Sequence, residues 1–275
     1  MVGASIAATD GYKFLIGYTI VGANSLALMV FFPSLLSLMG WSTEAEQVRA
    51  YNVWYNFLGS IWLALGLVSI LAFKEPIKYS PIYMTMLFYK SIWLLTTVLP
   101  NLLTGTLSGM NTMVAVAMFT FIVLDLKYIP VEYLQRSTSP PATSSGFSLL
   151  LWSTSLGMTA LGFLVFFPDA LESLGFTSEA AQIREHNIWL NILGSLWIAI
   201  GLTAMMSLRD STKFSTFYVA QLLAKCIWLL TTALPRALSG DLSPMNQLLA
   251  AVMLFFSALA FAVLPWDYLK SAKVA

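Results

Sequence analysis

Long apolar segments alternate with short polar ones along this chain of 275 residues. A transmembrane helix needs about 20 consecutive, mostly apolar residues, and eight segments reach that length. Pro100 and Pro235 are expected to end the third and seventh segments, because proline interrupts a helix. We therefore expect an all-α integral membrane protein with eight transmembrane helices. The expected spans are residues 12–32, 53–73, 81–99, 111–130, 147–167, 188–208, 216–234 and 246–265.

The pattern occurs twice. Residues 20–134 align without a gap to residues 155–269, and the tract Ile92–Thr97 returns as Ile227–Thr232. Each copy holds four expected spans. Because four is even, both copies should share one orientation, related by a pseudo-two-fold axis along the membrane normal. We expect a first four-helix unit over 1–134, a cytoplasmic linker over 135–146 and a second four-helix unit over 147–275.

Composition agrees with a membrane location and limits the metal, cofactor and partner types to be expected. The chain is 58% hydrophobic and 10% charged, whereas soluble domains carry about 25% charged residues. The net charge of +1 gives no reason to expect a nucleic-acid partner. Only one cysteine (Cys226) and one histidine (His186) occur, which excludes an internal disulfide and argues against a haem or di-iron centre. We expect no metal and no cofactor.

Basic residues indicate the orientation. If eight helices span the membrane, nine of the Lys and Arg residues outside mid-membrane fall on the side of both termini and only three on the other. Positive residues are enriched in cytoplasmic loops, so we expect both termini to be cytoplasmic. The nine are Lys13, Lys74, Lys78, Lys127, Arg136, Arg209, Lys213, Lys270 and Lys273, and the three are Arg49, Arg184 and Arg236.

Both copies keep a polar stripe at the start of the second span, within an arc of about 80° on a helix. These side chains either hydrogen-bond neighbouring helices or line a polar cavity. The arginine of each stripe lies near a glutamate, Glu44 or Glu179, and an interfacial ion pair is one interpretation. The stripes are Arg49, Asn52, Asn56 and Ser60 in the first copy, and Arg184, Asn187, Asn191 and Ser195 in the second.

The third span carries a lysine in both copies, Lys90 and Lys225. Each lies roughly 13 Å deep at 1.5 Å per residue, where an amine costs a few kcal/mol to insert. Asp125 is expected nearer the cytoplasmic end, and its counterpart is Ala260, so no duplicated carboxylate offsets that cost. The amine is neutral, or capped by Asn and Ser of the second span, or faces water or an anion. Tyr83 and Trp93 lie on the same expected helix as Lys90, and Tyr218 and Trp228 lie on the same expected helix as Lys225. The indoles of the two tryptophans could contact the amines.

No nucleotide-binding, metalloprotease or serine-hydrolase motif occurs, so an enzyme has no positive support. The first hypothesis is a protein that binds or transports a small polar or anionic solute, or a lipid. The alternatives are a structural or accessory subunit with partner membrane subunits, and a lipid-pathway membrane enzyme. The candidate ligand-binding residues are Lys90, Lys225, Asn52, Asn56, Asn187, Asn191, Tyr83, Tyr218, Trp93, Trp228, Arg49 and Arg184.

Overall fold

The computed structural model describes residues 10–50, 52–136, 145–185 and 187–271, and the side chains of Asn52 and Asn187 lie outside that description. The described residues form helices and no strand. Eight of the helices are long and apolar enough to cross a membrane, as the sequence predicts. They are Asp10–Phe31, Val53–Ala72, Ser80–Leu103, Gly109–Tyr128, Ser145–Phe166, Ile188–Ser207, Ser215–Ser239 and Pro244–Val263.

The helix bounds recur 135 positions apart. In the first half (residues 10–136) the long helices are α2 (Asp10–Phe31), α5 (Asn52–Ala72), α6 (Ser80–Trp93) and α8 (Gly109–Tyr128). In the second half (residues 145–271) they are α10 (Ser145–Phe166), α13 (Asn187–Ser207), α14 (Ser215–Trp228) and α16 (Pro244–Val263).

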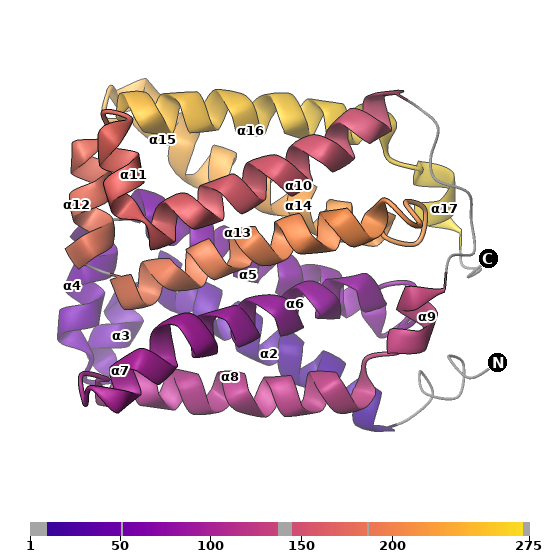
Figure 1. The fold of residues 1–275 in the computed structure, drawn as a ribbon, viewed down its shortest axis with the longest axis horizontal. Helices are drawn as coiled ribbons and strands as arrows, with labels where there is room; N and C mark the ends of the chain where they lie inside the picture. The colour runs from indigo at the N-terminus through magenta and orange to yellow at the C-terminus, as the bar shows by residue number, and fades with distance from the viewer. Residues whose placement is uncertain (1–9, 51, 137–144, 186, 272–275) are drawn as a thin grey trace.

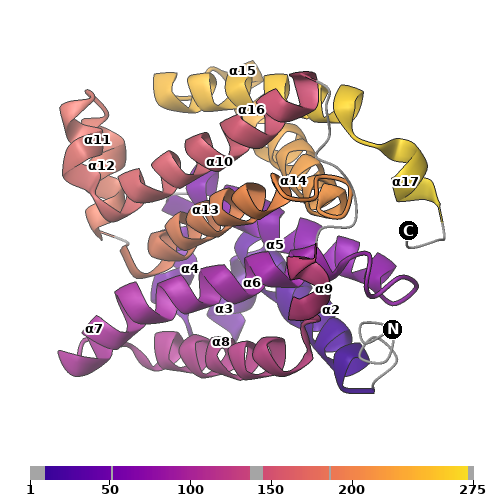
Figure 2. The same cartoon turned by 45° about the vertical axis from the view of Figure 1, so that its right-hand side comes forward.

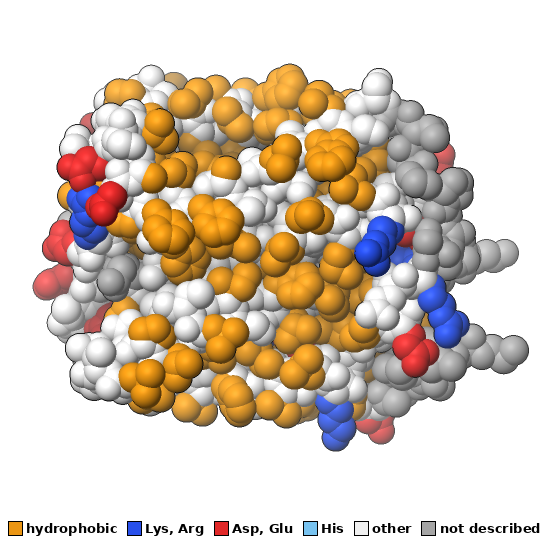
Figure 3. All heavy atoms as spheres, in the orientation of Figure 1, with side chains coloured by type: hydrophobic (Ala, Val, Ile, Leu, Met, Phe, Trp, Pro, Cys, Tyr) orange, Lys and Arg blue, Asp and Glu red, His pale blue; other side chains and the backbone are white. Residues whose placement is uncertain are grey.

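Short helices lie at the two ends of the long ones (Figure 1). We call the end with α9 (Val131–Gln135) and α17 (Trp266–Lys270) the tail end. The opposite, loop end carries α3 (Ser34–Leu38), α4 (Ser42–Ala50), α11 (Pro168–Ser173) and α12 (Thr177–Glu185). On the face shown in Figure 3, apolar side chains cover the surface between the ends, and charged ones gather at both ends. This distribution matches an apolar slab with wet faces on either side.

The expectation that Pro100 and Pro235 end their spans is wrong. After α6 the chain forms a π-helical turn, η1 (Leu94–Val98), and continues as α7 (Leu99–Leu103). The equivalent elements are η2 (Leu229–Ala233) and α15 (Leu234–Ser239). Side chains satisfy carbonyls in this turn: Asn101 Nδ2 donates to the Thr97 carbonyl over 2.8 Å. A proline is tolerated within a span when local π adjustments and side chains satisfy the freed groups.

The central helices of the two halves pack across the boundary (Figure 2). α6 packs mainly against α13, and α5 packs against α14 as well as against α2, whereas α5 and α6 barely touch. Two equivalent bonds join the halves here: Trp93 Nε1 donates to the Ile188 carbonyl (2.9 Å), and Trp228 Nε1 donates to the Val53 carbonyl (3.1 Å). The core therefore belongs to both halves at once.

Buried lysines join the halves again at the tail end. Lys78 Nζ donates to the carbonyls of Leu269 (3.0 Å) and Ser271 (2.5 Å), at the end of α17, and pairs with Glu75 at 2.7 Å. Lys213, 135 positions later, bonds carbonyls at the corresponding end of the first half.

Lys213 Nζ donates to the carbonyls of Tyr133 (2.8 Å) and Arg136 and lies 3.5 Å from Asp210. Burial lowers the pKa of Lys213, and the charge of Asp210 opposes that shift. Cations are favoured at the carbonyl end of a helix. Each half thus holds the end of the other, and we call the two sets of bonds the tail clasps.

Candidate functional site

Lys90 is buried on α6 and has a carboxylate partner. Its Nζ donates to Asp125 Oδ2 over 2.8 Å, and both side chains are almost fully enclosed. None of the three environments expected for the buried lysines includes a carboxylate partner, so that expectation is wrong for Lys90. Among the described side chains, no Asn or Ser of the second span hydrogen-bonds Lys90, and Ser60 Oγ donates instead to the Asn56 carbonyl over 2.7 Å.

Aromatic rings fill the remaining space around this ion pair. Lys90 Nζ lies 4.1 Å from the centre of the Phe121 ring, within cation–π range. Tyr18 stacks on the Phe121 ring, with centroids 4.2 Å apart. A methyl group added at Gly22 would come within 3.0 Å of Phe121. The first-half amine is therefore neutralised and closely packed.

Lys225, on α14, is 5% exposed and lacks this carboxylate. The position equivalent to Asp125 is Ala260, and no described Asp or Glu pairs with Lys225. The equivalent ring, Phe256, lies 5.9 Å from Lys225 Nζ, further than Phe121 lies from Lys90. Lys90 and Lys225 occupy equivalent positions in the two copies of the repeat, but their surroundings differ.

A cavity of about 50 Å³ lies beside Lys225. It exists because Ser153 replaces the equivalent of Tyr18, so no ring fills this space. Gly157, the equivalent of Gly22, has open space where a methyl group would be. The neighbouring Trp152 and Leu156 are exposed on the apolar face of α10. The wall consists of Ser153, Thr154, Gly157, Met158, Leu161, Lys225, Val252, Met253 and Phe256.

The other candidate residues within the spans serve mainly as contacts between helices. The indoles of Trp93 and Trp228 bond backbone carbonyls of the opposite half, and the lysines contact phenylalanine rings instead. Asn191 Nδ2 donates to Thr97 Oγ1 over 3.1 Å across the boundary, and Asn56 is half-buried. Tyr83 and Tyr218 are buried, and the Tyr218 hydroxyl lies 3.1 Å from Ser207 Oγ. The roles predicted for Asn52 and Asn187 fall outside the described side chains.

The two arginines lie apart from the lysines. Arg49 and Arg184 are on α4 and α12 at the loop end, and both are exposed. Arg184 pairs with Asp169 and Glu172, not with Glu179. Hydrogen bonds to Asp169 and then to Glu172 raise the pKa of the Arg184 guanidinium above its ordinary value. These residues form a surface cluster and are not part of the Lys225 cavity.

No family model, curated protein or solved structure matches this chain. The class of protein is therefore set by the fold alone: eight apolar helices define a multi-pass integral membrane protein.

Proposed function

We propose that this protein binds a small anionic group inside the membrane at Lys225 and moves it through or within the bilayer. One observation carries the proposal: Lys225 faces a cavity without a carboxylate, whereas Lys90 is paired with Asp125 in a packed core. A buried amine without a partner is costly in a membrane. An anion entering the cavity would offset that cost.

The ligand class follows from charge and space. A site with one lysine and no acidic residue favours a ligand group that carries a single negative charge. The cavity is about 50 Å³, and a cavity of roughly 10–15 Å³ by the same measure holds one water molecule, so the space suits a group of a few atoms such as a carboxylate. The cavity lies beneath the apolar face of α10, where Trp152 and Leu156 are exposed. We therefore propose the carboxylate end of an amphipathic acid, such as a fatty acid, whose chain remains in the bilayer.

We also propose that the halves are tandem copies in one orientation, with the tail end cytoplasmic. The recurrence of helix bounds 135 positions apart supports duplication. Basic residues at the tail end outnumber those at the loop end, which supports the orientation. Single cysteines at Arg136 and Gly240, in a Cys226→Ser background, test it with a membrane-impermeant maleimide. Labelling of Arg136→Cys from outside intact cells would contradict it.

The test of binding uses purified protein in lipid nanodiscs. Oleate should displace a fluorescent fatty-acid analogue from the wild type, and Lys225→Met should weaken oleate binding by roughly tenfold or more, because a charged hydrogen bond is lost. Lys127→Met is the matched control, since Lys127 is exposed near the end of α8. Vesicles containing the protein should show oleate movement that Lys225→Met reduces. Equal binding by Lys225→Met and wild type would overturn the proposal.

A second candidate is a structural subunit of a membrane complex. The packed surroundings of Lys90 favour it, because Asp125 and Phe121 occupy the space that a ligand would need there. Native mass spectrometry of gently extracted protein separates the two. A stoichiometric protein partner supports the subunit, and a lone chain with bound fatty acid supports the carrier.

A further inference from the structure

Two pockets of matching composition lie at the loop end, well away from Lys225. One has a volume of about 180 Å³ and the other about 250 Å³. Every residue lining the second lies 135 positions from a residue lining the first. Five of these matched pairs are identical: Glu44 and Glu179, Gln47 and Gln182, Trp54 and Trp189, Ser108 and Ser243, and Asn111 and Asn246.

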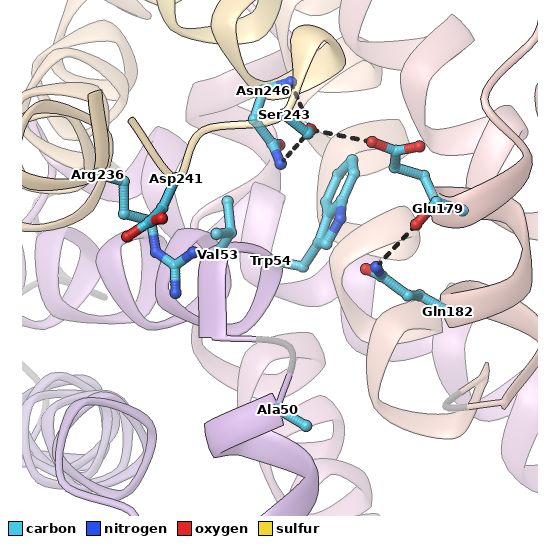
Figure 4. Close-up of a pocket in the computed structure, with 10 residues that line it drawn as sticks. Ala50, Val53, Trp54, Glu179, Gln182, Arg236, Asp241, Ser243 and Asn246 are labelled. Atoms are coloured by element: carbon cyan, nitrogen blue, oxygen red, sulfur yellow. Dashed lines mark hydrogen bonds between the residues drawn. The ribbon is translucent and has the colours of Figure 1, made fainter. Parts of the chain in front are cut away.

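Each pocket needs both halves. In the smaller one, Glu179 on α12 and Asn246 on α16 come from the second half, and Trp54 on α5 comes from the first (Figure 4). The larger pocket exchanges these origins, with Glu44 and Asn111 from the first half and Trp189 from the second. The cross-boundary packing of the central helices therefore creates both pockets.

The polar wall of the smaller pocket is a fixed hydrogen-bonded chain. Ser243 Oγ donates to Glu179 Oε1 over 3.0 Å and accepts from Asn246 Nδ2 over 3.0 Å (Figure 4). Glu179 and Asn246 are only 8% and 7% exposed. A buried glutamate and a buried amide are thus held in place, not free to turn toward bulk water.

Asn246 still lacks one partner. Because its Nδ2 is bound to Ser243, its Oδ1 remains, and no described donor reaches that buried oxygen. Buried polar atoms are nearly always hydrogen-bonded, so an orphan points to a missing water or ligand. The missing group must be a donor. The Glu179 carboxylate in the same wall also accepts bonds and carries negative charge.

The charges of both linings are negative. The smaller pocket is lined by Glu179, Asp241 and Arg236, a net charge of −1, and the larger by Glu44 and Glu185, a net charge of −2. A metal ion is a poor fit, because the described residues contain no group of three or more metal-binding His, Cys, Asp or Glu. An indole beside an acid instead suits an organic cation, which its ring face attracts.

We propose that each loop-end pocket binds one small organic cation with N–H donors, such as a primary ammonium. The ammonium donates to Glu179 and to Asn246 Oδ1 in the smaller pocket, beside Trp54. Glu44, Asn111 and Trp189 form the equivalent site. These sites are separate from the Lys225 cavity, and they do not depend on the function proposed for it.

Calorimetric titration of the purified full chain with ethylammonium chloride tests the proposal, with sodium chloride at equal ionic strength as the blank. Wild type should bind two equivalents. Glu179→Gln and Glu44→Gln should each weaken one site by about tenfold, leaving one, and the double variant should bind none in the same range. Glu46→Gln is the matched control, because Glu46 is exposed on α4 and lines neither pocket.

A second variant keeps the test decisive if a glutamate variant folds poorly. Ser243→Ala removes the bond to Glu179 without changing any charge, and it should weaken only the smaller site. Absence of ethylammonium binding in the wild type, or two remaining sites in the Glu44→Gln/Glu179→Gln variant, would overturn the proposal. Oleate binding at Lys225 should be unchanged in every one of these variants.

Discussion

Lys90 and Lys225 lie at equivalent positions on α6 and α14, and two differences between the halves give them different surroundings. Asp125 is replaced by Ala260, which removes the carboxylate, and Tyr18 is replaced by Ser153, which removes a ring. The first lysine is therefore part of a packed core and the second faces a cavity. A duplicated residue has a duplicated role only if its neighbours are duplicated too.

The largest effect on stability is expected from removing the acid that pairs with Lys90. Asp125→Ala leaves Lys90 buried without its partner, and we expect a loss of about 3–5 kcal/mol in stability. The melting temperature in mild detergent measures it. Replacing the pair by apolar groups, Lys90→Met with Asp125→Leu, should restore most of the loss. An Asp125→Ala protein that melts like the wild type would contradict the structural role of Lys90.

The tail clasps should behave alike in the two halves, in contrast to the membrane lysines. Lys78→Met and Lys213→Met each remove charged hydrogen bonds to carbonyls of the other half. We expect each to lower stability by about 2–3 kcal/mol. Lys74→Met serves as the control, since Lys74 is exposed. A large effect from only one of the two clasp variants would show that the tail end is not equivalent in the halves.

Restoring the missing ring should convert the second half toward the first. Ser153→Tyr fills the cavity beside Lys225, and we expect oleate binding to weaken about tenfold, which is 1.4 kcal/mol. Ser153→Ala keeps the space open and should bind like the wild type. The displacement assay in nanodiscs measures both variants. Unchanged binding by Ser153→Tyr would place the ligand outside this cavity.

The smallest expected difference concerns two glycines. Gly22→Ala brings a methyl group within 3.0 Å of Phe121, whereas Gly157→Ala enters open space. Alanine is the better helix former by up to about 1 kcal/mol, so Gly157→Ala should be neutral or stabilising. Gly22→Ala should be less stable than Gly157→Ala by roughly 1 kcal/mol. Melting temperatures of the pair decide it, and the reverse order would contradict the open cavity.

Much of the fold could be predicted because apolar length is a strong signal. The eight expected spans agree with the eight apolar helices, apart from their ends at Pro100 and Pro235. The packing of α6 on α13 could not be predicted, because lipid-facing and helix-facing surfaces are both mostly apolar in a membrane protein. Hydrophobicity gives the segments of a membrane protein, but not which segment lies beside which.

The same limit applies to the surroundings of the buried lysines. The deep lysines stood out as costly charges, but position along the helix placed Asp125 too far from Lys90. The pair forms because α6 packs on α8, a contact that position along the chain does not give. The joint loss of Tyr18 and Asp125 in the second copy was a visible signal. The loop-end pockets were missed because their Glu, Trp and Asn come from segments far apart in sequence.

The tail clasps change what the segment between Arg136 and Ser145 does for the protein. Since the central helices and both clasps already bind one half to the other, that segment supplies local concentration rather than cohesion. The two halves are organised like the two subunits of a heterodimer, although a single polypeptide contains both. In such a design, separate expression of the halves as two polypeptides would preserve the interface, and divergence of one half could proceed while the other kept the scaffold.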